Sequence, residues 1–139
     1  MEQRALVRRL LTATIVLATV AGMALVLARP AAAPPSIHAP PGVRIRVQVL
    51  NATATRGLAR RATGFLRDRG FDVVEIATAP QARDSTLVID RSGHPEWAQL
   101  VARALGVAAV ESRLDTSRYL DVTVLVGRDW SPPSEPFYP

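Results

Sequence analysis

The hydrophobic positions fall into one long block near the start of the chain and a series of short periodic segments after it. The block, Leu10 to Ala28, holds nineteen residues without a charge and is bounded by arginine on both sides. As a helix at ~1.5 Å per residue it would be roughly 28 Å long, close to the thickness of a bilayer's hydrocarbon core. The pattern predicts a transmembrane helix over residues 10–28, preceded by a short segment, 1–9.

A cleaved signal peptide is the alternative interpretation of this block. The run Ala31-Ala32-Ala33 resembles a small-residue cleavage site, but Pro34 follows it directly. The block is also longer than the ~7–15 residues of a signal peptide's apolar region. We therefore expect an uncleaved anchor. Positive charges on the short N-terminal side predict that residues 1–9 are cytoplasmic and that the rest of the chain lies in a periplasmic or other extracytoplasmic space.

Proline-rich segments flank the remainder of the chain. Residues 29–42 contain five prolines and residues 131–139 contain four. The first segment favours a semi-rigid polyproline II spacer of ~3.1 Å per residue, about 40 Å long at most. We read His38, alone in this spacer, as part of the linker. The second segment is predicted to be an extended tail that carries Phe137 and Tyr138.

Between residues 43 and 130 the pattern changes to that of a folded domain. Apolar and polar residues alternate over 43–49, which predicts a half-buried strand, and further strands are predicted at 72–76, 86–90, 107–110 and 120–126. One helix is expected between an N-cap at Thr53 or Thr55 and Gly70, and another between Pro95 and Gly106. The order β-α-β-β-α-β(-β) predicts an α+β two-layer sandwich, ferredoxin-like or related, with both helices on one face of the sheet.

Length, composition and charge exclude several classes of function. A chain of 139 residues holds one ordinary domain, and the lack of cysteine excludes disulfides, Cys-ligated zinc, iron–sulfur clusters and thiol nucleophiles. All seventeen basic residues are arginine, yet +3 of the net charge of +5 belongs to residues 1–29. The five arginines between positions 56 and 69 lie on the polar side of the first predicted helix. A solvated helix face explains them better than phosphate binding, so no nucleic-acid partner is predicted.

No set of residues predicts catalysis. Asp84, Asp90 and Asp121 stand at strand ends, where acids are expected to be solvated turn formers, and His94 has no second ligand near it in the sequence. The loop 51–57 offers hydroxyls, backbone N–H groups and an arginine to an anion. It lacks the glycines and lysine of phosphate-binding loops, so helix capping is its expected role. We predict no enzyme activity, no metal and no cofactor.

Three segments in order resemble the LytR C-terminal domain family. In 47–59 a strand ends in Leu-Asn and a helix starts with Gly-Leu-Ala; in 66–74 a helix end is followed by Gly-Phe and a strand; in 120–129 a strand is followed by Gly-x-Asp. The resemblance covers about residues 43–130. It implies an accessory domain of cell-envelope proteins, found after the catalytic domain of LytR–CpsA–Psr glycopolymer transferases or alone behind an anchor. It carries over no catalytic residues.

Together these observations predict a non-catalytic, membrane-anchored domain that binds a cell-wall polymer or an envelope protein. The residues expected to contact the ligand or partner are polar and lie in two loops and one helix start: Asn51, Thr53, Thr55, Arg56, Arg60 and Arg83. The alternative is an assembly module that docks a protein partner through a sheet edge or the proline-rich tail. A small hydrolase or transferase is a third possibility, which the lack of a convergent acid–base set disfavours.

Overall fold

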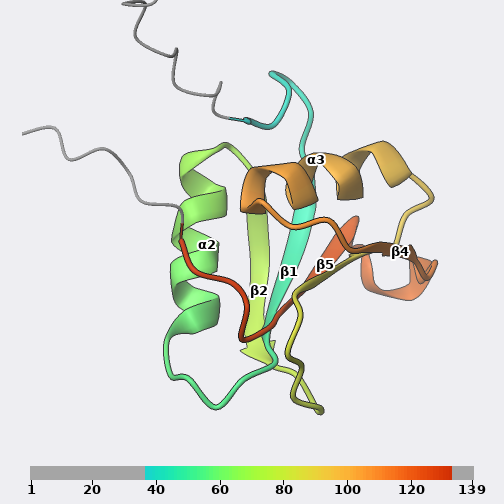
Figure 1. Ribbon diagram of the computed structural model, residues 1–139. Helices are drawn as coiled ribbons and strands as arrows, with labels where there is room; N and C mark the ends of the chain where they lie inside the picture. The colour runs from blue at the N-terminus through green and yellow to red at the C-terminus, as the bar shows by residue number, and fades with distance from the viewer. Residues whose placement is uncertain (1–36, 133–139) are drawn as a thin grey trace, which may run out of the picture. The chain divides into compact units, whose positions relative to one another are not determined.

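Five strands and two helices are formed by residues 37–132, the part of the chain that this computed structural model describes (Figure 1). The elements, in chain order, are β1 (Arg46–Asn51), α2 (Leu58–Asp68), β2 (Asp72–Thr78), β3 (Leu87–Asp90), α3 (Pro95–Leu105), β4 (Val110–Ser112), the short 3₁₀ helix η1 (Thr116–Arg118) and β5 (Val122–Val126). The expected anchor, most of the expected linker and most of the tail lie outside the described residues. Within 37–132 no helix is long and apolar enough to cross a membrane.

The strands form one mixed sheet in the order β2-β1-β5-β3-β4. β1 runs parallel to both of its neighbours, β2 and β5, while β3 is antiparallel to β5 and parallel to β4. In each β-α-β unit, then, the two strands that flank the helix lie next to each other. A ferredoxin-like sheet is built from split units, in which another strand lies between them. The predicted α+β class is confirmed, and the ferredoxin-like topology is wrong.

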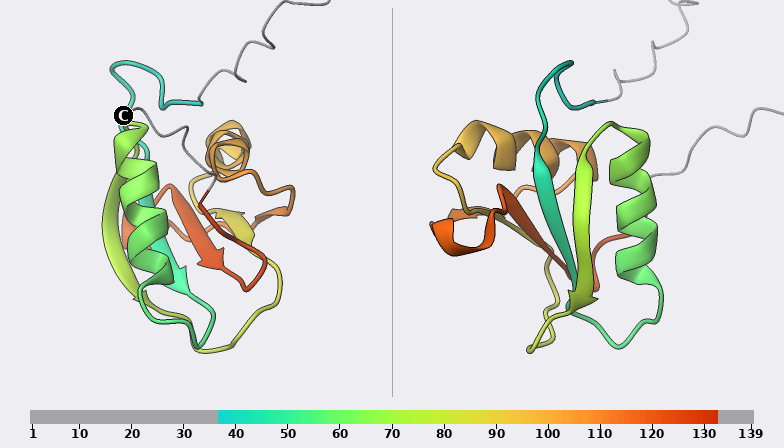
Figure 2. Two further views of the ribbon diagram at one scale, coloured as in Figure 1. Left: turned by 60° about the vertical axis from the view of Figure 1, so that its left-hand side comes forward. Right: turned by 180° about the vertical axis from the view of Figure 1, so that it is seen from behind.

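Both helices cover the same face of the sheet. The side chains of Val47, Val49, Val88, Val122 and Val124 point toward them and are fully buried in a single core. α2 packs on β1, β2 and β5, α3 packs on β3, β4 and β5, and the two helices touch each other. Seen from behind, β1 and β2 lie in front of α3 (Figure 2). The two-layer arrangement predicted from the sequence is therefore present, with a helix-free second face.

Helix ends follow the sequence signals at their C-termini but not at the start of α2. Gly70 adopts φ 82°, its N–H donates to the Arg67 carbonyl and the next N–H donates to the Leu66 carbonyl, which is a Schellman motif. Gly106 ends α3 in the same left-handed conformation. At the start of α2, however, the N-cap is Gly57, with φ 80° and no side-chain cap. The predicted cap at Thr53 or Thr55 is wrong.

Several strands are displaced from their predicted positions. β1 begins at Arg46 rather than at residue 43, and β2 continues to Thr78. β4 occupies 110–112 instead of 107–110, because the Val107 N–H is taken by the Ala102 carbonyl at the end of α3. The sequence thus predicts which segments form the strands, whereas the residues at which the strands begin and end depend on hydrogen bonds made elsewhere in the fold.

Two of the three acids at strand ends are buried rather than solvated. Asp90 and Asp121 are 2% and 3% exposed, whereas Asp84 is exposed and pairs with Arg128 at 3.1 Å. One carboxylate oxygen of Asp90 accepts the N–H groups of residues 92, 93 and 94, and this turn leads into α3. The expectation of solvated turn formers is correct for Asp84 alone, because Asp90 and Asp121 find hydrogen-bond donors within the fold.

Candidate functional site

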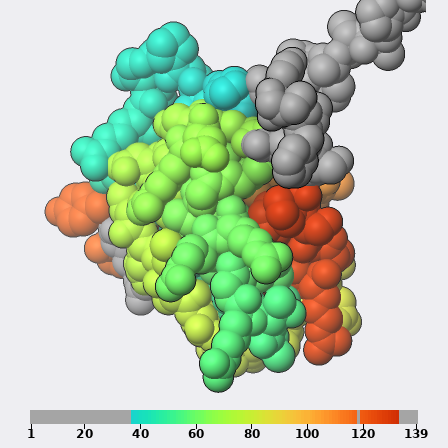
Figure 3. Space-filling view, turned by 90° about the vertical axis from the view of Figure 1, so that its left-hand side faces the viewer, coloured from blue at the N-terminus to red at the C-terminus, as the bar shows by residue number. Residues whose placement is uncertain are grey.

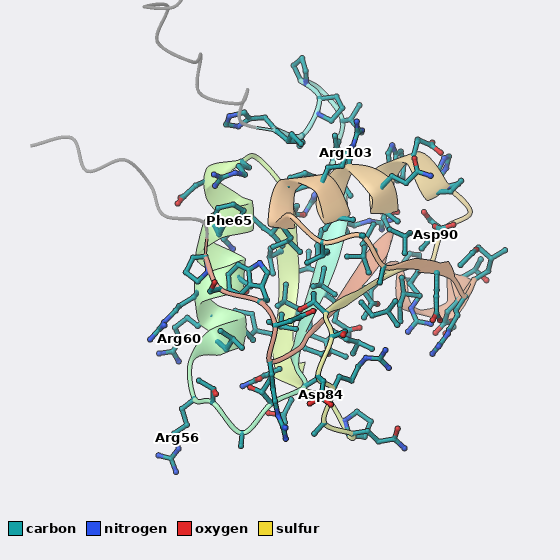
Figure 4. The ribbon with its side chains drawn as sticks, in the orientation of Figure 1. Arg56, Arg60, Phe65, Asp84, Asp90 and Arg103 are labelled. Atoms are coloured by element: carbon teal, nitrogen blue, oxygen red, sulfur yellow. The ribbon has the colours of Figure 1, made fainter. Side chains whose placement is uncertain are left out.

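The carboxyl ends of β1, β2 and β5 lie at one end of the domain, because these three strands are parallel. Backbone hydrogen bonds connect the segments that follow them: the Ala52 N–H donates to the Val126 carbonyl, the Ala79 N–H to the Asn51 carbonyl and the Arg83 N–H to the Ala52 carbonyl. The figure shows Arg56 and Asp84, from two of these segments, at the same end (Figure 4). All six predicted contact residues therefore belong to this end of the molecule or to the adjoining first turns of α2.

A groove of about 530 Å³ lies between the start of α2 and the ends of β1 and β2. Its lining residues are Asn51, Arg56, Gly57, Ala59, Arg60, Ile76, Ala77 and Thr78. Both arginines are exposed, and neither makes an ion pair with any residue of the range 37–132. Figure 3 views the molecule from the side on which α2 lies. The groove therefore carries two cationic side chains that a ligand can reach.

The loop that leads into α2 is organised by its own side chains. The Asn51 amide donates to the Thr55 carbonyl at 2.9 Å, and its oxygen accepts the Thr53 N–H at 3.0 Å and the Thr53 hydroxyl at 2.8 Å. The Thr53 hydroxyl in turn accepts the Thr55 N–H. These hydrogen bonds explain why neither threonine caps the helix. Asn51, Thr53 and Thr55 hold the loop in place, and Arg56 and Arg60 are left to face a ligand.

Arg83 does not line the groove. It lies in the loop between β2 and β3, is half-buried, and donates from Nε to the Ser85 carbonyl at 3.4 Å. The neighbouring Asp84 forms an ion pair with Arg128, and the Arg128 N–H donates to the Arg83 carbonyl, so this loop is joined to the segment after β5. The structure thus brings Asn51, Arg56 and Arg60 together around one groove and leaves Arg83 beside it.

The Gly-x-Asp sequence after β5 has a structural explanation. A Cβ atom on Gly127 would lie 2.5 Å from the Ser85 carbonyl carbon, so only glycine fits here. The Thr86 hydroxyl accepts the Gly127 N–H at 2.9 Å, and the Asp129 carboxylate accepts both the N–H and the hydroxyl of Thr86 at 2.8 Å. This cluster fixes the exit of β5 against the start of β3.

The helix-free face of the sheet holds a polar cluster that the sequence analysis did not single out. Gln48 and Thr123 are 5% and 0% exposed and lie side by side in register on β1 and β5, with Arg91 bonded to Thr123. The only signal in the sequence was a polar residue between valines in each strand, which is also the ordinary pattern of a solvated face. Burial distinguishes the two cases, and burial depends on the segment that covers the face.

Metal-binding chemistry has no basis in the described residues. No group of three or more His, Asp or Glu side chains between residues 37 and 132 could hold a metal ion. His94 lies 3.0 Å from Glu96 and stacks on Trp97, with 4.0 Å between ring centroids. These contacts give it a local structural role at the start of α3.

Comparison with known proteins identifies similarities in sequence and in structure. A family model described as "LytR cell envelope-related transcriptional attenuator" matches residues 44–130. The solution structure of the C-terminal domain of RV0431 is 31% identical, covers 71% of this chain and 85% of its own, and has a TM-score of 0.40. The comparison with curated proteins finds no match. The matched segment contains the whole sheet, both helices and the groove.

Proposed function

Because this chain belongs to the LytR C-terminal domain family, an envelope-associated accessory domain and not the catalytic domain of LytR-family proteins, we propose that it binds an anionic polymer of the cell wall. The binding surface in this proposal is the groove beside the start of α2. Residues 10–28 serve as an uncleaved membrane anchor, with residues 1–9 in the cytoplasm. The domain then lies in the periplasmic or other extracytoplasmic space.

The observation that carries the proposal is the pair of arginines in the groove. Arg56 and Arg60 are four residues apart, one just before α2 and one in its first turn, and both are exposed and without an ion pair in the described part of the chain. Guanidinium groups bind phosphate and carboxylate through paired hydrogen bonds, so two of them suit a polymer with repeated anionic groups. The self-contained loop from Asn51 to Thr55 keeps its shape without a ligand, which lowers the entropic cost of binding.

Co-sedimentation with purified cell-wall sacculi tests the proposal. The full-length chain, kept soluble in mild detergent, is mixed with sacculi at low and high salt, and the pelleted fraction is measured. We expect pelleting at low salt that falls as ionic strength rises, because salt screens exposed charges. The double variant Arg56→Ala/Arg60→Ala should bind about 2- to 30-fold more weakly, as the loss of two exposed ion pairs predicts.

A matched control removes the same charge from other places. Arg61 and Arg103 are exposed on α2 and α3, outside the groove, and Arg103 lies far from Arg56 (Figure 4). Arg61→Ala/Arg103→Ala should pellet like the parent chain. Equal weakening by both double variants would mean that net charge alone drives binding, and the groove would have no special role.

The edge of the sheet supports the alternative function, docking of a protein partner. β2 is an edge strand, and its Val74 and Ile76 side chains are 48% and 45% exposed. An exposed apolar edge strand is a template for the addition of a strand from another chain. Binding that responds neither to salt nor to the groove arginines would contradict the polymer proposal and favour this edge.

A further inference from the structure

The outer side of β2 is an open edge of the sheet. Residues 74–78 are all exposed, and no segment of the range 37–132 pairs with this side of the strand. The bulge in the pairing of β2 with β1 falls near the start of the strand, so residues 75–78 continue in regular register. In the left view of Figure 2, β2 lies at the outer margin of the sheet, next to α2. Such an edge presents unpaired N–H and C=O groups to another chain.

The opposite edge of the sheet, β4, is less suited to the addition of a strand. β4 has three residues, against seven in β2. Directly after it, the Arg113 side chain pairs with Glu111 at 2.6 Å, and the Arg113 N–H donates to the Asp90 carbonyl. Short length and charged side chains are two ways in which proteins prevent strand addition. β2 instead exposes the apolar side chains of Val74 and Ile76.

A row of arginines at α2 runs alongside the open edge. Arg60 and Arg67 are seven residues apart and therefore lie on the same side of the helix. Arg67 donates from Nη2 to the Val73 carbonyl at 2.8 Å, near the start of β2. Arg56 and Arg60 line the groove together with Ile76, near the end of β2, and both are labelled in Figure 4. Arg56, Arg60 and Arg67 thus form an arginine row that follows β2 from end to start.

The arginine row has no acidic partner among residues 37–132. None of the ion pairs in this range includes Arg56, Arg60 or Arg67, and the first turn of α2 holds no acid. Gly64 lies between Arg60 and Arg67 on the same side of the helix, and a Cβ built on it has no neighbouring heavy atom within 4 Å. The edge is therefore bordered by positive charge, with room beside the helix for the side chains of a docked segment.

We propose that an acidic segment of a protein partner adds to β2 as a further strand. Its main chain pairs with the outer side of residues 74–78, and every second side chain faces α2 and meets the arginine row. Carboxylates at alternate positions of a strand are about 7 Å apart, and Arg60 and Arg67 are about 10 Å apart along the helix axis, so two or three acids can reach the row. This inference names the chemistry of a partner for the edge and does not rest on polymer binding in the groove.

Other occupants fit the edge less well. A second copy of the chain would pair β2 with its own symmetry mate, which brings two arginine rows to one seam, where they repel each other. The tail 131–139 contains four prolines, whose missing N–H groups prevent regular pairing. A polysaccharide has no main-chain amides to pair with a strand. A peptide with acidic side chains satisfies both the edge and the row.

Binding of a labelled heptapeptide to the full-length chain in mild detergent tests the inference. The probe alternates threonine and glutamate, so it favours an extended conformation and carries a carboxylate at every second position. We expect saturable binding in fluorescence anisotropy, with a Kd in the micromolar to millimolar range. The matched peptide with lysine in place of glutamate should bind at least about tenfold more weakly. Equal binding of the two peptides, or no binding of the glutamate peptide, would overturn the proposal.

Two N-methylated forms of the probe test whether its main chain pairs with β2. A strand points the N–H groups of alternate residues to opposite sides, so methylation of all glutamates or of all threonines blocks one side only. One form should bind at least about tenfold more weakly, and the other should bind like the unmodified peptide. Equal effects of the two methylations would overturn strand addition and leave the recognition of anionic groups alone.

A charge exchange tests the arginine row by a gain of binding. Arg56→Glu/Arg60→Glu should prefer the lysine peptide, which reverses the preference of the parent chain. Arg61→Glu/Arg103→Glu makes the same change in net charge at exposed positions outside the row and should keep the parent's preference. An unchanged preference in the first variant, or equal reversal in both, would contradict the site. Failure of the chain to pellet with sacculi would contradict the polymer proposal and leave these expectations unchanged.

Discussion

At the scale of single residues, Asp121 shows how one carboxylate can hold two strands together. Its oxygens accept the Arg46 backbone N–H at 2.8 Å, the Nε at 3.0 Å and the Nη2 at 3.1 Å, while its own N–H donates to the Arg46 carbonyl. The start of β5 is thereby fixed to the start of β1. Burial raises the pKa of the Asp121 carboxyl, but the hydrogen bonds and the charge of Arg46 outweigh it and hold this pKa below its ordinary value.

The depressed pKa of Asp121 predicts a loss of stability in acid. A carboxyl whose pKa is lower in the folded state stabilises the fold above its unfolded pKa of about 3.9, and this contribution is lost as pH falls toward the folded pKa. Asp121→Asn should therefore lower the free energy of unfolding by about 2 kcal/mol at pH 7, since it removes charge-assisted hydrogen bonds. Urea unfolding at pH 7 and pH 3 measures both effects. A difference between parent and variant that stays constant down to pH 3 would show that Asp121 does not titrate in this way.

At the scale of elements, two glycines illustrate opposite demands on the same residue type. Gly127, at the end of β5, has the backbone of Ser85 and Thr86 where a Cβ would be. Gly64 lies in the middle of α2, is exposed, and has no heavy atom within 4 Å of a Cβ built on it. The first glycine is needed for packing, and the second only lowers the helix propensity of its segment.

One substitution should therefore have opposite effects at the two positions. Gly127→Ala is expected to destabilise the domain by at least about 2 kcal/mol, because the contact is with backbone that cannot rotate away. Gly64→Ala should stabilise it by about 0.5–1 kcal/mol. The denaturant midpoints for unfolding of the two variants and the parent chain test both expected changes in stability. A stabilised Gly127→Ala would mean that the loop before β3 can move, contrary to the packing described above.

Which elements the sequence predicts correctly depends on how local their signals are. The ends of both helices at Gly70 and Gly106 are confirmed, because a left-handed glycine and the residues beside it complete the motif. The predicted N-cap of α2 is wrong because the Thr53 hydroxyl, which would have capped the helix, donates to the Asn51 side chain instead. In the candidate site, the groove arginines were predicted. The buried Gln48 was not, because its partners Thr123 and Arg91 are distant in sequence.

At the scale of the whole molecule, Trp130 joins parts of the domain that are far apart in sequence. The ring is 5% exposed and meets Phe65 of α2 edge-on, with centroids 6.2 Å apart. Its indole N–H donates to the carbonyl of Leu105, the last residue of α3. Trp130, four residues after the end of β5, thus contacts both helices. The strand order could not be predicted from the sequence for a related reason, because β5 lies between β1 and β3 only in the completed fold.

Loss of Trp130 should accordingly weaken the domain as a unit. Trp130→Ala is expected to lower the free energy of unfolding by about 3–5 kcal/mol, and Trp130→Phe by less, since phenylalanine keeps part of the buried ring. Leu114→Ala serves as a control, because Leu114 is 65% exposed and should cost less than about 0.5 kcal/mol. Urea unfolding followed by circular dichroism measures all three. Equal effects of Trp130→Ala and Leu114→Ala would mean that the packing of the two helices does not depend on Trp130.

The direction of β1 determines how the domain would carry a mechanical load. The chain enters at the start of this strand (Figure 1). The groove lies at the strand's far end, about 20 Å away over six residues. A pull between the entering chain and a polymer held in the groove would run along β1. Both of its ladders, with β2 and with β5, would then be sheared at once instead of opening bond by bond. Tension would thus fall on the best-paired strand of the sheet, where the domain can resist stretching most strongly.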